Sequence, residues 1–245
     1  IDPVVANPMP RDDIDENERL MAHDAGARHV ITAISANTQG GVITRSYRDY
    51  LLRAWHHVSP YGNPGWLQSW GRDLDQCDFL ALQEADSGSW RSAFQHQARE
   101  LSHHMGFSAC HHQENRRLGR VLCSGNALLS RHGAGEVDRF SFDGVSRGAI
   151  LARYSCEDGV DLVVVNTHLS LSRTRRREQV DTIARAVEGQ DRVIVMGDFN
   201  AEPHSPEMRA LASQMHCVNH QPTHPSWKPQ RCLDHVWIRG MEPLE

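Results

Sequence analysis

The sequence lacks the features that define several simple classes of protein. It has no run of about 18 apolar residues, so it predicts no membrane-spanning helix. Its six cysteines form no C-x-x-C pair and are too thinly spread for a disulfide scaffold, so we expect free and mostly buried thiols. The formal net charge of −5 argues against a protein that coats nucleic acid by charge alone. Sixteen histidines are present, but none of their adjacent pairs has the spacing of a zinc protease.

What is present indicates one folded domain. Apolar residues make up 39% of the chain and charged residues 23%, a balance typical of a sequence with a sizeable core. Residues 1–28 are acid-rich and contain several prolines, so we expect a polar N-terminal arm followed by a single domain over residues 29–245. Because the sequence starts with isoleucine, removal of a signal peptide stays open, and so does the choice between a cytoplasmic and an exported protein.

Short apolar runs predict strands, and longer runs with a period near 3.6 residues predict helices. The expected strands cover residues 29–37, 78–84, 121–130, 136–142, 147–155, 161–168, 191–199 and 233–239. The expected helices cover residues 45–58, 66–76, 87–105, 174–188 and 205–215. Wholly apolar strands mixed with strands in hairpin order indicate sheets whose outer faces are covered by helices.

Polar side chains stand at the ends of these apolar strands. The residues concerned are Asn37, Glu84, His168, Asp198 with the nearby Asn200, and Asp234. Any one of them alone is explained by a turn or a cap, where Asn and Asp are common. Together they indicate one site, because buried polar groups need partners and are therefore expected to meet one another.

The same residues occur in motifs that resemble the endonuclease/exonuclease/phosphatase superfamily, the DNase I-like, metal-dependent phosphoesterases. The motifs are L-Q-E, G-N-A-L-L-S, S-R-G-A-I-L, N-T-H-L-S, G-D-F-N-A-E-P and L-D-H-V, in the family's order over residues 29–240. L-Q-E and G-D-F-N are specific when they occur together in this order. The resemblance implies an α/β fold, a four-layered α/β/β/α sandwich in which two mixed sheets pack face to face between helices.

The resemblance also implies a role for each polar residue. Asn37 and Glu84 would hold Mg²⁺ or Mn²⁺, and hard oxygen ligands suit these ions on chemical grounds alone. Three side chains would bind phosphate oxygens, namely Arg147, His168 and Asn200. Four would be catalytic, namely His168, Asp198, Asn200 and Asp234, with Asp198 orienting or deprotonating the attacking water.

One motif of the family, a terminal S-D-H whose histidine is the general base, does not occur before Glu245. We expect the natural chain to continue past Glu245 and to supply a last strand with this motif, because an apolar sheet edge would otherwise be left unpaired. The alternative is a protein without the general base. Asp234 matches the aspartate that orients that base. His235 is its neighbour on the expected strand, so it should point to the opposite face and take no part.

The expected function is Mg²⁺-dependent hydrolysis of a phosphodiester by in-line attack of water, carried out by a monomer. A nucleic-acid substrate is slightly favoured, because R-T-R-R-R at 173–177 could form a phosphate-facing rim with Arg116, Arg117 and Arg120. A solvated helix face is the alternative for these arginines. The rival functions are a phospholipid or phosphoinositide phosphoesterase, similar to a sphingomyelinase or an inositol phosphatase, and an inactive phosphate-binding module.

Overall fold

The structure is a computed structural model that describes residues 30–39, 74, 76–142 and 144–244. The polar arm expected over residues 1–28 and the helix expected over residues 45–58 lie outside the described residues. Only Leu74 and Gln76 are described from the helix expected over residues 66–76.

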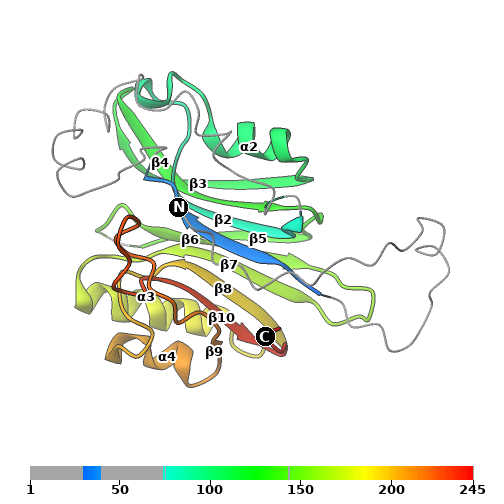
Figure 1. Cartoon of the computed structure of the whole chain (residues 1–245). Helices are drawn as coiled ribbons and strands as arrows, with labels where there is room; N and C mark the ends of the chain where they lie inside the picture. The colour runs from blue at the N-terminus through cyan, green and yellow to red at the C-terminus, as the bar shows by residue number, and fades with distance from the viewer. Residues whose placement is uncertain (1–29, 40–73, 75, 143, 245) are drawn as a thin grey trace.

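One sheet has four strands in the order β1-β2-β4-β3 (Figure 1). Its strands are β1 (Ala33–Asn37), β2 (Phe79–Asp86), β3 (Ala109–Leu118) and β4 (Leu122–Ser130). β1 and β2 are parallel, whereas β4 is antiparallel to both β2 and β3. β3 is not among the predicted strands, because this edge strand reads A-C-H-H-Q-E-N-R-R-L and only Gln113 in it is buried.

The second sheet has six strands in the order β5-β6-β7-β8-β10-β9. Its strands are β5 (Glu136–Ser141), β6 (Gly148–Tyr154), β7 (Leu162–His168), β8 (Arg192–Asp198), β9 (His216–Cys217) and β10 (Asp234–Arg239). β7 and β8 are parallel and in register, and the other neighbours are antiparallel. Apart from the two-residue β9, every strand of this sheet lies within one or two residues of a predicted strand.

Within the described residues, the helical elements are shorter than the sequence predicts. They are the 3₁₀ turn η6 (Trp90–Ser92), α2 (Gln97–Met105), α3 (Arg173–Ala186), the 3₁₀ turn η7 (Pro206–Met208) and α4 (Arg209–Ala212). The helix expected over residues 87–105 begins only at Gln97, because Asp86 binds the hydroxyls of Ser89 and Ser92 and fixes the preceding segment as a turn. Gly106 ends α2 in the left-handed conformation, at the position that the sequence predicts.

Because side chains alternate between the two faces of each strand, the apolar core has three layers, one between the two sheets and one between each sheet and its helices. Val193 and Val195 pack outward with α3 and α4, whereas Ile194 and Met196 point inward to the space between the sheets. The four-stranded sheet likewise packs against α2 on its outer face. The result is the expected α/β/β/α sandwich, with α2 over one sheet and α3 and α4 over the other (Figure 1). Among the described helices, none is long and apolar enough to span a bilayer.

The six cysteines are all free thiols, as the sequence predicts. Three of them are buried, namely Cys77, Cys123 and Cys232.

Candidate functional site

Four strands bring the predicted polar residues to one edge of the sandwich. β7 ends at His168 and β8 ends at Asp198, and the two residues are paired in the parallel register. β10 begins at Asp234, which lies opposite Asp198 in the antiparallel register. Asn37 ends β1 in the other sheet, yet its side-chain amide reaches Asp198. The site therefore forms where both sheets meet.

Asp198 is the centre of this network. Its Oδ2 accepts a hydrogen bond from Asn37 Nδ2 at 3.0 Å and lies 3.5 Å from His168 Nε2. Its Oδ1 accepts from the backbone N–H of Asn200 at 2.9 Å. Three different segments thus hold one carboxylate in a fixed orientation, as required of a group that positions water.

Asn200 and Arg147 flank this network. Asn200 has a left-handed backbone with φ of 52°, which turns the chain so that its Nδ2 donates to the carbonyl of Leu169 at 2.9 Å. Arg147 Nε donates to the same carbonyl at 3.2 Å. Both side chains are half-buried, so each retains hydrogen-bonding groups that solvent or a ligand can reach.

Burial shifts the pKa values of the two groups beside Asp198. It lowers the pKa of His168, an effect that the charge of Asp198 opposes and that Arg147 reinforces. His168 is therefore a neutral imidazole at neutral pH. Burial and then the charge of Asp198 raise the pKa of Asp234 to about 7, against a hydrogen bond with Thr223 that lowers it.

Glu84 reaches the site from an irregularity in β2. The register between β2 and β4 shifts between Leu82 and Ala85, and Glu84 has a left-handed backbone with φ of 56°. Bulges of this kind re-aim a side chain, at a cost in backbone strain that is common at functional sites. The Glu84 carboxylate makes no hydrogen bond or ion pair with any described residue.

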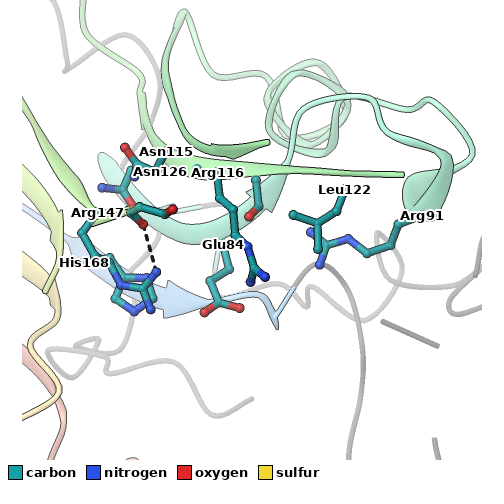
Figure 2. A pocket seen from close by; sticks show the side chains of 11 residues that line it. Glu84, Arg91, Asn115, Arg116, Leu122, Asn126, Arg147 and His168 are labelled. Carbon is teal, nitrogen blue, oxygen red and sulfur yellow. Dashed lines mark hydrogen bonds between the residues drawn. The ribbon is translucent and has the colours of Figure 1, made fainter. Parts of the chain in front are cut away.

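A pocket of about 70 Å³ joins Glu84 to two of the phosphate-binding candidates, Arg147 and His168, whereas Asn200 does not line it (Figure 2). It is lined by Glu84, Arg91, Asn115, Arg116, Leu122, Ser124, Gly125, Asn126, Ser146, Arg147 and His168. Figure 2 shows the Glu84 carboxylate between Arg116 on one side and Arg147 with His168 on the other. Buried Oδ1 atoms of Asn115 and Asn126 have no hydrogen-bond partner in the described part of the chain, so they can accept bonds from a ligand or from water.

Asn37 and Glu84 fit a hard divalent cation. Glu84 contributes a carboxylate that is unpaired within the described residues. Asn37 Oδ1 accepts one bond from Gln39 N at 3.0 Å, and no other described residue occupies its second lone pair. No cluster of three His, Cys, Asp or Glu side chains suited to a metal occurs among the described residues. Mg²⁺ needs no such cluster, since it keeps several waters and binds through one or two protein oxygens.

The arginine-rich segment does not line the pocket. Arg173 and Arg176 bind the buried carboxylate of Glu207, and Arg175 donates to the carbonyl of Gly144. Arg117 pairs with Glu114, so Arg116 is the one member of the expected rim at the pocket within the described structure. The predicted phosphate-facing rim is therefore wrong for Arg173, Arg175 and Arg176, because these guanidinium groups have structural partners, and Arg177 does not line the pocket either.

His235 lies on the opposite face of β10 from Asp234, as the alternation predicts. Its ring is fully buried and stacks on Phe199 with the centroids 4.7 Å apart. Trp237 Nε1 donates to its Nδ1 at 3.3 Å. His235 is thus part of the core between β10 and α3 and has no route to the pocket.

Apart from Arg116, which the sequence places in the expected arginine rim, the other residues that line the pocket are not predicted from the sequence. Arg91 carries no motif and reaches the pocket through the turn that Asp86 builds. Asn115 and Arg116 lie on the missed strand β3. Asn126 lies in the G-N-A-L-L-S motif, and this motif is the feature of the sequence from which a place for Asn126 at the site could have been predicted.

Solved structures with this architecture define the class of fold. An endonuclease/exonuclease/phosphatase family protein from Leptotrichia buccalis is 15% identical, with a TM-score of 0.58 over 87% of this chain and 88% of that chain. A mannosyl-6-phosphatase from Bacteroides thetaiotaomicron is 16% identical, with a TM-score of 0.56 over 86% and 85%. The human nocturnin catalytic domain with bound sulfate is 20% identical, with a TM-score of 0.52 over 66% and 69%.

The chain belongs to the endonuclease/exonuclease/phosphatase family, whose model matches residues 34–244. Members of this family are hydrolases of phosphoesters and are generally metal-dependent. Among curated proteins, none matches the sequence.

Proposed function

We propose that this protein is a divalent-metal-dependent phosphodiesterase that acts by in-line attack of water. The proposal rests on one observation, namely that side chains from both sheets meet at the carboxylate of Asp198. Asn37 contacts it from one sheet and His168 from the other. A pocket lined by three arginines and by a glutamate without a partner among the described residues adjoins it. This combination provides acceptor groups for water and cationic donors for a phosphate in a single open site.

Each side chain has a task in that reaction. Asp198, held by Asn37 and by the backbone of Asn200, accepts a proton from the attacking water or orients it. Arg147 donates to the non-bridging phosphate oxygens, on which charge increases in the transition state. Neutral His168 donates one hydrogen bond to the same oxygens, without the cost of a buried charge.

Asn37 and Glu84 would hold the metal. A bound Mg²⁺ or Mn²⁺ would lower the repulsion between the phosphate and its nucleophile and would stabilise the leaving oxygen. Asp234 lies beside Asp198, and its proposed task is to orient a general-base histidine. A nucleic-acid backbone and a lipid phosphodiester are both substrates that this chemistry can serve.

The test is hydrolysis of bis-p-nitrophenyl phosphate, with p-nitrophenyl phosphate as the monoester comparison. We expect turnover of the diester with Mg²⁺ or Mn²⁺, no turnover in a chelator, and a decrease of about 100-fold or more in His168→Ala. His132→Ala is a matched control, since that histidine is exposed and pairs with Asp78 away from the site. A wild-type protein that binds the metal but turns over neither ester would contradict the proposal and favour a phosphate-binding module.

A further inference from the structure

An exposed apolar cluster lies beside the pocket, on η6 with the turn that follows it and on the hairpin that joins β3 to β4. Seven large hydrophobic side chains are exposed among the described residues, and four of them lie here: Trp90, Phe94, Leu118 and Val121. Their exposed fractions are 50%, 53%, 61% and 42%. Single exposed apolar residues are normal on a protein surface, whereas several gathered in one place mark an interaction surface.

Backbone hydrogen bonds hold the two segments of this apolar cluster together. Trp90 N donates to the carbonyl of Arg120 at 2.8 Å, and Arg91 N donates to that of Val121 at 3.3 Å. The rings of Trp90 and Phe94 meet edge to face, with their centroids 6.0 Å apart. The apolar cluster is therefore a preformed surface and not a set of unrelated loop side chains.

The apolar cluster is continuous with the pocket. Arg91 follows Trp90 in the sequence and Leu122 follows Val121, and both Arg91 and Leu122 line the pocket. Figure 2 shows these two side chains at one end of the pocket, with Arg116 between them and Glu84. A molecule that rests its apolar part on the cluster can therefore present a phosphate to the site.

Unpaired cations border the apolar cluster. Arg116 and Arg120 are exposed, and their side chains make no hydrogen bond or ion pair with the described residues. Arg117 differs, because it is paired with Glu114. Apolar side chains that project from a surface beside free arginines suit the interface of a bilayer with anionic headgroups. A tryptophan among them fits this environment, since its amphipathic ring favours the headgroup level.

We propose that the apolar cluster docks this protein on an anionic phospholipid bilayer and directs the pocket at lipid phosphodiesters. The lipid substrate rests on the proposed function, whereas the docking does not. Trp90 and Phe94 by themselves would also suit the bases of a single-stranded nucleic acid, which stack on aromatic rings. Leu118 and Val121 favour the bilayer, because they have no π face to stack on a base but do insert among acyl chains.

The first experiment is flotation of the full chain with vesicles of phosphatidylcholine alone and of phosphatidylcholine with phosphatidylserine. We expect binding to the anionic vesicles, and a decrease of roughly tenfold when Leu118→Ser and Val121→Ser are combined. Val30→Ser is the matched control, as an exposed apolar residue three positions before β1. Arg120→Ala should weaken binding about fivefold, and Arg177→Ala on α3 should not.

A second measurement separates docking from catalysis. The Leu118→Ser, Val121→Ser protein should hydrolyse bis-p-nitrophenyl phosphate like the wild type, which also shows that it is folded, but should lose turnover of phospholipid in vesicles. If the wild type hydrolyses no ester, vesicle binding still tests the docking alone. The proposal is overturned if the wild type binds no vesicle. A second pair of results would also overturn it. In that outcome, Trp90→Ala and Phe94→Ala reduce binding of a single-stranded oligonucleotide, and the Leu118 and Val121 substitutions leave vesicle binding unchanged.

Discussion

Asp234 and Asp198 lie directly opposite each other in the antiparallel pair formed by β10 and β8. Two carboxyls in such a position cannot both ionise freely, and the charge falls on the one with more partners. Asp198 accepts hydrogen bonds from Asn37 and Asn200, whereas Oδ1 of Asp234 is buried without a partner among the described residues. Asp198 therefore has beside it a carboxyl that retains its proton up to neutral pH.

The first prediction concerns the pH dependence of stability. The pKa of Asp234 is raised from 3.8 to about 7, so its contribution to stability is full below the unfolded value and is lost as the pH rises through 7. Asp234→Asn removes this loss. Between about pH 5 and about pH 8, the wild type should lose about 2 kcal/mol more unfolding free energy than the variant.

Urea denaturation in the presence of a chelator measures this difference. Asp161→Asn is the matched control, since Asp161 is an exposed carboxyl before β7. Parallel pH profiles for the wild type and Asp234→Asn would contradict the assignment.

The second prediction concerns metal binding at Glu84. Its carboxylate has no partner in the described structure, so Glu84→Gln should leave the stability of the metal-free protein nearly unchanged. The wild type should gain thermal stability as Mg²⁺ or Mn²⁺ is added, because a ligand of the folded state stabilises it by mass action. Glu84→Gln should lose most of this gain in a thermal-shift titration, while Glu178→Gln on the exposed face of α3 should retain it. Equal gains in all three proteins would place the metal elsewhere.

The third prediction concerns Asp198. Asp198→Asn retains the size of the side chain but removes the charge and the ability to accept a proton. We expect kcat for the diester to fall by about 100-fold to 10,000-fold with a much smaller change in KM, because the group acts on the attacking water. Single-substrate kinetics on folded protein measure the two constants separately. A rise in KM alone would assign Asp198 to substrate binding.

Strands and their ends could be predicted from the sequence because each signal is local. Runs such as V-V-V-N-T-H and V-I-V-M-G-D contain both the apolar strand and the polar residue that ends it. Alternation along the strand predicts that His235 points to the face opposite Asp234. Its ring stacks on Phe199 in the core, which confirms that prediction.

The rest of the site depends on contacts that no local signal encodes. β3 is an edge strand with largely exposed side chains, so its sequence lacks the alternation by which strands are found. Arg91 reaches the pocket only because Asp86 gathers Ser89, Ser92 and Arg91 into a turn. Arg173, Arg175 and Arg176 belong to one run in the sequence, but their partners are a distant glutamate and a loop carbonyl, so these three side chains do not face the pocket.

The fourth prediction concerns the polar link between the two sheets. Asn166 is fully buried on β7, and its Nδ2 donates to the carbonyls of Leu82 at 3.0 Å and Ala127 at 2.7 Å. Its Oδ1 accepts from Gln83 Nε2 at 2.8 Å. Asn166→Leu leaves these partners buried and unsatisfied, so it should lower the unfolding free energy by about 3 kcal/mol.

A double-mutant cycle with Gln83→Leu tests whether the bond between Asn166 and Gln83 is responsible. Each single variant leaves one buried amide without its partner, whereas the double variant removes both. The double variant should therefore be less destabilised than the sum of the single variants, by about 1 kcal/mol. Urea denaturation of the four proteins gives the coupling energy. Additive values would show that Asn166 stabilises the sandwich through its backbone contacts alone, and Gln83 would then have no part in linking the sheets.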